Sequence, residues 1–542
     1  MDAVAEAEAA APLDAALAGA APAYDPRWGG RFRPVRVTDG RSLQGDLDLD
    51  ADVCVVGSGA AGAVVARLLS EAGADVVVLE EGSYVRADRY ARFRPSETLR
   101  HLWRDGGMTT VIPLGDTPPI GLALGRCVGG SSVLTGGVCF RVPEDVHHEW
   151  VHDFGLAEMA YERFVPAYEE VERNVRVESV PPEMRARGVH LFAEGAARLG
   201  HPLRPVRRNT EGCCGCARCN VGCPNLAKLS VDLTYLPQAA DARARIYADC
   251  LVQRVTVDGD RATGVIGRVL DERRRPRGRL RVRARLVVLA AGTIHTPLVL
   301  SRSGLGRWSG QVGRNVTLHP GFRVMGLFDE KVEPWKGALQ SAYTDAFHHE
   351  GIMLIAAFGP PTIVAPGLPG VAEELHEHLA RLPYLACFGG MVHDGPGGRV
   401  RRFVGREPLI TYRFSPRDRA RFRRGIRLLA ETFFAAGARA VYLPLLGARP
   451  VKSVEELRIV DEFPARRIEC MAFHPLGSAR MARRAEDGVV NEWGEAFEVR
   501  NLVVADGSVF PSSLGVNSQI AIMSNATRIT HRLREERGRW KS

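Results

Sequence analysis

The 542-residue sequence predicts an α/β fold, in which a discontinuous Rossmann-like nucleotide-binding domain carries an inserted α+β domain on a mostly antiparallel sheet. Residues 52–81 join an apolar run, a glycine turn, an amphipathic segment and a second apolar run, which is a strand–turn–helix–strand unit. An apolar strand, a glycine and a helix recur at 286–306, and a last strand and closing helix occupy 501–533. Between these two regions, residues 321–446 form alternating short β-rich runs.

The first strand–turn–helix–strand unit carries glycines at the GxGxxG spacing of dinucleotide-binding sites. The first glycine permits a sharp turn, the second lets the backbone approach a pyrophosphate, and the third lets helix and strand pack closely. The helix N-terminus then directs unpaired N–H groups at the diphosphate, and an acid ending the second strand accepts hydrogen bonds from ribose hydroxyls. The residues expected to bind the dinucleotide here are Gly57, Gly59, Ala60, Gly62, Glu80 and Glu81. This motif alone leaves NAD and FAD open.

The other elements follow in chain order. Residues 83–126 have irregular periodicity and four prolines, which is typical of a covering loop. Helical patterns dominate 144–199, β-rich runs with a hairpin extend over 244–285, and Ser415-Pro416 predicts the start of a helix that ends near Ala435. Together these patterns predict a flexible N-terminal lead at 1–30, a nucleotide-binding domain made of 31–160, 212–320 and 465–535, and an inserted domain made of 161–211 and 321–464.

Composition restricts the classes of partner. The net charge of +9 comes mostly from arginine, and the densest basic run, 273–285, has no interleaved aromatic residues. A solvated hairpin is therefore expected there, and no nucleic-acid partner. No apolar run reaches the roughly eighteen residues of a transmembrane helix, so none is expected. The alanine-rich N-terminus lacks the basic region of a signal peptide, and we expect a cytoplasmic location.

Five of the eleven cysteines fall between residues 213 and 223. The run contains C-x2-C-x2-C-x3-C-P, which is the spacing of iron–sulfur ligands in bacterial ferredoxins, although no second set of cysteines completes a ferredoxin-like pair of clusters. Three alternatives stay open: an iron–sulfur cluster, a zinc or structural thiol site, and reduced thiols beneath a loop. The candidate ligands are Cys213, Cys214, Cys216, Cys219 and Cys223.

Two segments near the C-terminus complete a recognisable set of motifs. They are HPLGSARM at 474–481 and LVVADGSVFPSSLGVN at 502–517, and they follow GSGAAG, GRCVGGSS, LVVLAAGTIHTPLVL and VGRNVTLHPG in order along the chain. In these motifs the chain resembles the glucose-methanol-choline (GMC) oxidoreductases. The resemblance implies a discontinuous Rossmann-like FAD-binding domain, an inserted substrate domain, and oxidation of an alcohol by hydride transfer to flavin N5.

The resemblance also implies roles for individual residues. His474 matches the active-site histidine of the family and Asn517 its partner. A histidine can accept the hydroxyl proton as the carbonyl forms, and an asparagine amide can orient the alcohol oxygen. By the same resemblance, Val252 would contact the adenine through its backbone. The remaining residues that would line the flavin or its diphosphate are Gly129, Gly130, Ser131, Ser132, Gly292, Asp506, Gly507, Asn517 and Ser518.

The implied reaction converts a lipophilic primary or secondary alcohol to an aldehyde or ketone, because the His/Asn pair and the cysteine segment most resemble long-chain alcohol and sterol-type members. The electron acceptor would be oxygen or an external acceptor. Two alternatives stay open: a sugar or polyol dehydrogenase that passes electrons through an iron–sulfur centre, and a non-catalytic flavin-binding electron-transfer subunit. Thr135 and Ser518 depart from the residues usual in the family, and His295 and His319 are interpreted as structural or cofactor-adjacent.

Overall fold

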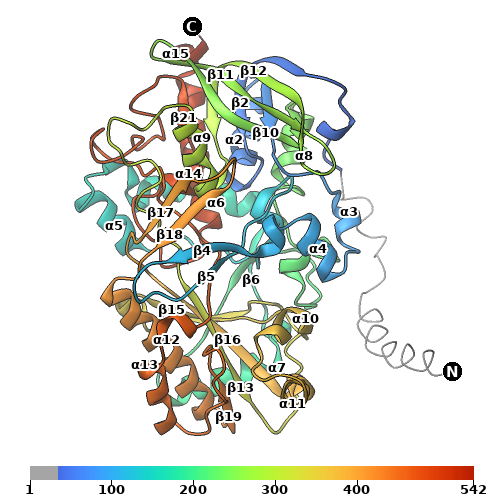
Figure 1. Ribbon diagram of the computed structural model, residues 1–542, viewed down its shortest axis with the longest axis vertical. Coiled ribbons are helices and arrows are strands. Elements are labelled where there is room, and N and C mark those ends of the chain that lie inside the picture. The colour runs from blue at the N-terminus through green and yellow to red at the C-terminus, as the bar shows by residue number, and fades with distance from the viewer. Residues whose placement is uncertain (1–33, 542) are drawn as a thin grey trace, which may run out of the picture.

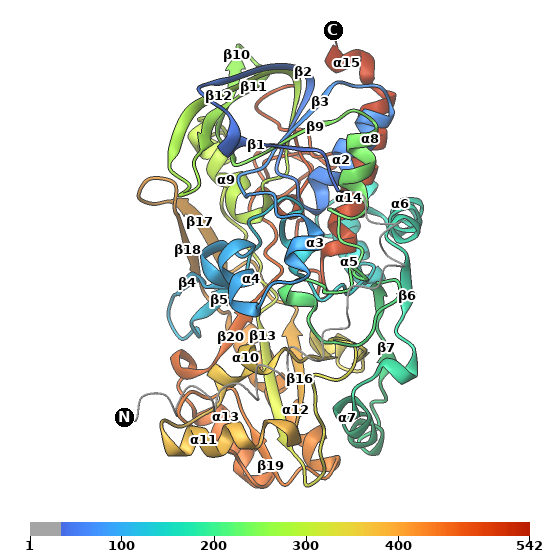
Figure 2. The ribbon, with the colours of Figure 1, turned by 90° about the vertical axis from the view of Figure 1, so that its right-hand side faces the viewer.

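A computed structural model describes residues 34–541, and the predicted lead at 1–30 lies outside the described residues. Figure 1 shows two sheets that follow one another along the long axis of the molecule, and Figure 2 shows the same arrangement from the side. The predicted α/β class, with a mixed sheet and a mostly antiparallel one, is confirmed. The positions of the domain boundaries stay a prediction.

The first sheet has eight strands in the order β1-β9-β3-β2-β12-β11-β10, with β21 also paired to β12. Strands β1, β9, β3, β2 and β12 are parallel, and β10, β11 and β12 are antiparallel. The strands are β1 (Val37–Asp39), β2 (Leu47–Val56), β3 (Val76–Leu79), β9 (Arg245–Ala248), β10 (Cys250–Asp258), β11 (Arg261–Leu270), β12 (Pro276–Leu289) and β21 (Leu502–Val504).

Strand β12 is one continuous strand, whereas the sequence predicted a basic hairpin arm followed by a separate apolar strand. Residues 276–285 alternate between buried and exposed positions, whereas 286–289 are buried throughout. The arginines therefore lie on the solvent face of the arm, and the apolar end enters the core. Along its length β12 pairs with β2, its first part also pairs with β11, and Val287–Leu289 pair with β21.

Helices pack around this sheet. Almost every side chain of α2 (Ala60–Glu71) is buried, because small and β-branched residues let it lie against both the sheet and other helices. Helix α14 (Gln519–Glu535) packs against α2 and α6, and α8 packs against α2. The other helices of this half are α5 (Glu144–His152), α6 (Tyr161–Asn174), α8 (Tyr235–Asp241), α9 (Gly292–Arg302) and α15 (Arg537–Lys541).

The second sheet has eleven strands in the order β17-β18-β4-β5-β20-β13-β16-β15-β14-β7, with β19 paired to β13. Pairs β18–β4 and β5–β20 are parallel, and the other pairs are antiparallel. The strands are β4 (Thr109–Pro113), β5 (Ile120–Leu122), β7 (Arg204–Pro205), β13 (Gly321–Leu327), β14 (Ala342–Thr344), β15 (Ile352–Ala356), β16 (Leu385–Val392), β17 (Gly398–Arg402), β18 (Pro408–Tyr412), β19 (Ala440–Tyr442) and β20 (Cys470–Ala472).

Strands β4 and β5 correct the interpretation of 83–126 as a covering loop. Val111, Ile120 and Leu122 are buried in the core of the second sheet, so this part of the segment is a structural element of the substrate side. Pro113 ends β4, and Pro118 and Pro119 lie in the connection to β5, where no ladder hydrogen bond is lost, while Pro95 begins α4. Strand β20 likewise brings the start of the C-terminal region, Cys470–Ala472, into this sheet.

The predicted helix after Ser415 is confirmed as α12 (Pro416–Ala435), which packs against β13 and β16. The Ser415 hydroxyl accepts a hydrogen bond from the amide of Asp418, and the two side chains form a capping box. The remaining elements are α3 (Ala87–Tyr90), α4 (Pro95–His101), β6 (Val177–Ser179), α7 (Arg187–Arg198), β8 (Arg207–Asn209), α10 (Pro361–Val364), α11 (Glu373–Ala380) and α13 (Ile459–Glu462). Within residues 34–541, no helix has the length and apolarity to cross a membrane.

Candidate active site

The glycine turn between β2 and α2 leaves no room for side chains at two of its three glycines. Gly57 has a φ of +101°, and a Cβ there would lie 2.3 Å from the carbonyl oxygen of Ala290 at the end of β12. A Cβ on Gly62 would lie 1.9 Å from the carbonyl oxygen of Gly57. The turn therefore needs glycine for its own backbone geometry and for close packing of helix on strand.

Gly59 has open space above it. A Cβ on Gly59 would meet only the Cα of Gly130, at 3.9 Å, and Gly59 caps α2 without a side-chain hydrogen bond. The GGSS segment lies directly beside this turn, since the amide of Gly129 donates to the hydroxyl of Ser58 (3.0 Å). Two glycine-rich backbones and the free first turn of a twelve-residue helix thus form a cradle of the kind that binds a diphosphate.

The two glutamates after β3 have different partners. The Glu80 carboxylate accepts hydrogen bonds from the amide (3.0 Å) and hydroxyl (2.8 Å) of Ser58 and from the amide of Gly82 (2.8 Å), and burial raises its pKa. Glu81 forms an ion pair with Arg104 at 2.7 Å. Burial acts to raise the pKa of Glu81, but the charge and hydrogen bond of Arg104, together with His295 and Arg406, lower the pKa to about 2. Glu80 therefore holds the glycine turn, and Glu81 is committed to Arg104.

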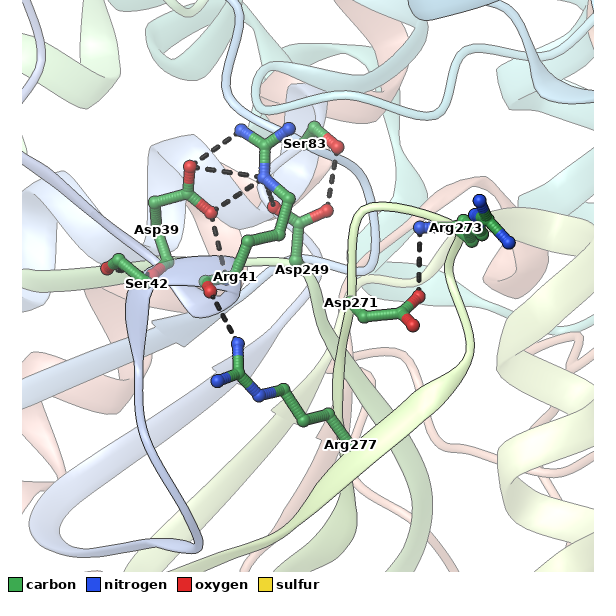
Figure 3. Close-up of polar contacts among 8 residues, drawn as sticks. All are labelled: Asp39, Arg41, Ser42, Ser83, Asp249, Asp271, Arg273 and Arg277. Atoms are coloured by element: carbon green, nitrogen blue, oxygen red, sulfur yellow. Dashed lines mark hydrogen bonds and ion pairs between the residues drawn. The ribbon is translucent and has the colours of Figure 1, made fainter.

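Val252 lies near Glu80 because the amide of Cys250, the first residue of β10, donates to the carbonyl of Glu80 (2.8 Å). Figure 3 shows the contacts that hold the start of β10 in place. The Asp249 carboxylate accepts a hydrogen bond from Ser83 (2.7 Å) and forms an ion pair with Arg41 (3.3 Å). Burial raises the pKa of Asp249 to about 6. This buried contact attaches the chain next to β1 to the strand that carries Val252.

Asp506 connects the end of the first sheet to α9. Its carboxylate accepts from the amides of Gly292 (2.8 Å) and Ser508 (2.8 Å) and from the hydroxyl of Thr296 (2.5 Å). Gly507 is buried, and a Cβ there would lie 2.9 Å from Leu476, so the chain passes close to the 474–481 segment at this point. Asp506 thereby fixes the backbone at Gly292 and at Ser508.

The GGSS segment forms a 3-10 helix, Gly130–Leu134, with both serines bound to nearby backbone. Ser131 accepts from the amide of Gly125 (2.9 Å), and Ser132 donates to the carbonyl of Gly129 (2.7 Å). Thr135, which departs from the family pattern, donates its hydroxyl hydrogen to Gln519 (3.0 Å). This contact links the GGSS segment to the start of α14, directly after Asn517 and Ser518.

The two C-terminal segments run side by side and bring the predicted catalytic pair together. The amide of Ala479 donates to Ser508 O (2.8 Å), and that of Met481 donates to Val509 O (2.7 Å). The side-chain amide Nδ2 of Asn517 lies 3.1 Å from Nε2 of His474, so Nδ2 donates and Nε2 accepts. That contact requires the His474 tautomer with its proton on Nδ1.

Burial keeps His474 in its neutral form. Burial lowers the pKa of His474 to about 4, so the imidazole is neutral at pH 7 and presents an acceptor at Nε2. The amide oxygen of Asn517 is buried and has no hydrogen-bond partner among the described residues. The unpaired amide oxygen is an acceptor that a donor group bound in the site would satisfy.

Behind His474 lies a buried network that the sequence interpretation missed. Nε2 of His319 accepts from the amides of Leu514 (2.8 Å) and Gly515 (3.1 Å), and its ring centroid is 5.6 Å from that of His474. The backbone of His319 has a φ of +50°, an unusual conformation for this residue type. His319 therefore anchors the loop that carries Asn517. The sequence predicted only a structural or cofactor-adjacent role for it.

Asp394 holds the same loop from the other side. Its carboxylate accepts from the amides of Leu318 (2.8 Å) and His319 (3.1 Å), from the hydroxyl of Ser513 (2.9 Å), and from the hydroxyl of Tyr412. Burial raises the pKa of Asp394 to about 6. The one sequence signal for this hydrogen-bond network was an aspartate just after the apolar run of β16.

The five clustered cysteines are not arranged as a set of metal ligands among the described residues. Across residues 34–541, no three histidine, cysteine, aspartate or glutamate side chains converge to hold a metal ion. The Cys219 thiol instead accepts from the buried guanidinium of Arg208 (3.0 Å), and the Cys214 thiol accepts from Asn225. Iron binding through Cys213, Cys214, Cys216, Cys219 and Cys223 thus stays a prediction without geometric support, and no electron-transfer step is assigned to it.

The cysteine segment is nonetheless tied to the GGSS segment. Nζ of Lys228 donates to the carbonyls of Val133 (2.6 Å), Thr135 (2.8 Å) and Cys219 (3.0 Å). Burial lowers the pKa of Lys228 to about 8. Lys228 therefore acts as a buried cross-link between the two segments.

A glycine cradle at the first βαβ turn and a buried His/Asn pair define a flavin-dependent oxidoreductase. The chain matches the GMC oxidoreductase N-terminal model over residues 51–321 and the C-terminal model over 406–526, and it belongs to that family, whose members are FAD-dependent. FAD is thus the cofactor, and the open backbone above Gly59 fits it.

Relatives extend over most of the chain. An uncharacterised GMC-type oxidoreductase of Mycobacterium tuberculosis is 39% identical over 479 residues, which are 88% of this chain and 74% of the relative. The long-chain-alcohol oxidase FAO4B of Arabidopsis thaliana is 29% identical over 89% of this chain and 67% of its own. In fold, the chain is similar to pyridoxine 4-oxidase from Mesorbium loti, with a TM-score of 0.69, 19% identity, and coverage of 89% and 98% of the two chains.

Proposed function

We propose that the protein oxidises a lipophilic primary or secondary alcohol to the aldehyde or ketone. The observation that carries this proposal is the 3.1 Å contact between Nε2 of His474 and Nδ2 of Asn517 in a buried site. The similarity to a long-chain-alcohol oxidase over 89% of the chain supports the substrate class. Phe473, which is 45% exposed beside His474, offers an apolar surface at the same place.

The proposed roles of the cofactor-binding residues follow from the cradle. The backbones of Gly57 and Gly59 and the first turn of α2 at Ala60 would bind the diphosphate, because N–H groups at a helix N-terminus attract anions. Glu80 would reach the ribose with lone pairs that its three hydrogen bonds leave free. The residues that would face the isoalloxazine and ribityl groups are Gly129, Gly130, Ser131, Ser132, Gly292, Asp506, Gly507 and Ser518.

Bound FAD supplies the hydride acceptor for the reaction. The protein moves the proton of the reaction. The alcohol O–H replaces Nδ2 of Asn517 at the one lone pair of Nε2 of neutral His474 and donates its proton there, so that the O–H electron pair can form the carbonyl as hydride leaves the carbon. Nδ2 of Asn517 donates to the same oxygen and fixes its orientation. His319 and Asp394 act through position, because they hold residues 513–515 and thus the amide of Asn517.

The test is anaerobic flavin reduction by a panel of long-chain alcohols, sterols and polyols. We expect loss of the 450 nm flavin absorbance with the lipophilic alcohols, and about 100-fold to 10,000-fold slower reduction in His474→Ala with FAD still bound. Absence of reduction by every alcohol would indicate a non-catalytic flavin protein. Reduction by polyols alone would change the proposed substrate class to polyols, but it would not contradict the role of His474 as the base.

The acceptor is tested in the same preparation. The reduced enzyme is mixed with oxygen or with an artificial acceptor such as a quinone, and peroxide is measured. Fast reoxidation by oxygen with stoichiometric peroxide would identify an oxidase, and reoxidation by the quinone alone a dehydrogenase.

A further inference from the structure

The β17–β18 hairpin ends in exposed apolar residues. Its two strands lie at the left-hand edge of the molecule in Figure 2. At its tip, Phe403 is 63% and Val404 is 72% exposed; Met108, just before neighbouring β4, is 70% exposed, and Ile112 on β4 is 45% exposed. Single exposed apolar side chains need no explanation, but four on adjacent strands and at their ends form a patch.

The strand register places Arg399, Arg401, Leu409 and Ile112 on one face, and the exposed Arg402, Phe403 and Val404 lie at the tip of the hairpin. Arg399 pairs with Thr411 and Arg401 with Leu409, and Thr411 pairs in turn with Ile112. Alternate residues of a strand point to opposite sides, and those between them, among which are Val111, Val400 and Ile410, are buried in the core. The outer face of these three strands is therefore both basic and apolar.

The arginines of this face and of the hairpin tip form no ion pair with a carboxylate among the described residues. They are Arg399, Arg401 and Arg402, whereas Arg406 lies 3.4 Å from Glu407. Arg302 of α9 donates to the carbonyl of Gly405 (3.2 Å) and adds positive charge. We call this area the hairpin surface; it consists of Met108, Ile112, Arg399, Arg401, Arg402, Phe403, Val404 and Leu409.

We propose that the hairpin surface binds the face of an anionic phospholipid bilayer. Phe403 and Val404 would enter the boundary between headgroups and acyl chains, while the guanidinium groups bind lipid phosphates with paired N–H donors. A second copy is disfavoured as the occupant, because a symmetric contact would place the unpaired arginines of both copies against one another. The proposal does not depend on which alcohol is oxidised.

The test is co-sedimentation of the flavin-loaded full chain with vesicles of phosphatidylcholine alone or with 30% phosphatidylserine. We expect binding to the anionic vesicles only, weakened by raising the salt concentration. Phe403→Ser/Val404→Ser should weaken partition by about tenfold or more, since two apolar side chains no longer leave water. Arg401→Gln/Arg402→Gln should weaken it by about 20-fold to 30-fold, at roughly fivefold for each arginine.

Matched controls remove similar groups elsewhere. Val371→Ser changes another exposed apolar residue (80% exposed), and Arg458→Gln/Arg466→Gln removes two exposed charges outside the hairpin surface. Both should bind vesicles like the wild type, and all variants should retain FAD. The proposal is overturned if the wild type binds neither vesicle at low salt, if the hairpin variants bind as it does, or if the hairpin variants instead dissociate a dimer in solution.

Discussion

The pH dependence of alcohol oxidation follows from the burial of His474. Its pKa of about 4 leaves about nine-tenths of the imidazole neutral at pH 5, whereas a histidine with the ordinary pKa near 6.5 would be about 3% neutral. The rate of flavin reduction should therefore change by less than about twofold between pH 8 and pH 5. It should then fall roughly tenfold per pH unit below pH 4.

Rapid mixing under anaerobic conditions measures this rate directly, with circular dichroism confirming that the protein is folded at each pH. His349→Gln, which changes an exposed histidine, is the control and should leave the profile unchanged. A drop of about 30-fold between pH 8 and pH 5 in the folded wild type would refute the reasoning. It would mean that the base is solvated as an ordinary histidine is.

Four further outcomes are expected. Gly59→Ala should leave the apoprotein as stable as the wild type while weakening FAD binding. Gly62→Ala should destabilise the fold itself, because its Cβ would lie 1.9 Å from the carbonyl oxygen of Gly57. Equal thermal unfolding of the two apoproteins would contradict this. His319→Leu should lower the free energy of unfolding by about 2–6 kcal/mol, since the amides of Leu514 and Gly515 lose their acceptor, and His319→Gln should recover part of it in urea titrations. Burial lowers the pKa of both His474 and His393 to about 4. The stability that these neutral histidines permit above pH 6.5 should therefore be lost as the pH falls toward 4, by about 2 kcal/mol for each at pH 5. Unfolding free energies of the wild type and His393→Gln at pH 7 and pH 5 check the direction of this change. Thiol titration in denaturant should find eleven free thiols without stoichiometric iron, and three or four irons with acid-labile sulfide per chain would show that the cysteines rearrange around a cluster.

Local patterns in the sequence predicted most of the elements. The strand–glycine–helix unit at the start, the capped helix after Ser415 and the closing helix were all correct, because apolar periodicity and cap residues act over a few positions. Strands β4 and β5 were missed because they are short and lie among prolines. Their apolar side chains become meaningful only beside strands from distant parts of the chain.

The residues of the site likewise include some that motifs predict and some that only the fold brings together. His474 and Asn517 stand in motifs, and their side chains lie in contact, while their catalytic roles stay a prediction. Asp394 and Tyr412 stand in no motif, and their relation to Ser513 arises only where three chain segments meet. The cysteine spacing resembles a ligand set, and metal binding by these thiols stays a prediction, because no three ligating side chains converge among residues 34–541.

Strand β12 has a consequence for how the chain is made. It pairs with β2 near the start of the chain and with β21 near its end, and α14, which packs on α2, emerges from the ribosome later still. The flavin site cannot form until His474, Asp506 and Asn517 have been synthesised, long after β2 and α2. The nascent first sheet must therefore wait with β12 partly unpaired, and that interval is when chaperones would be needed most.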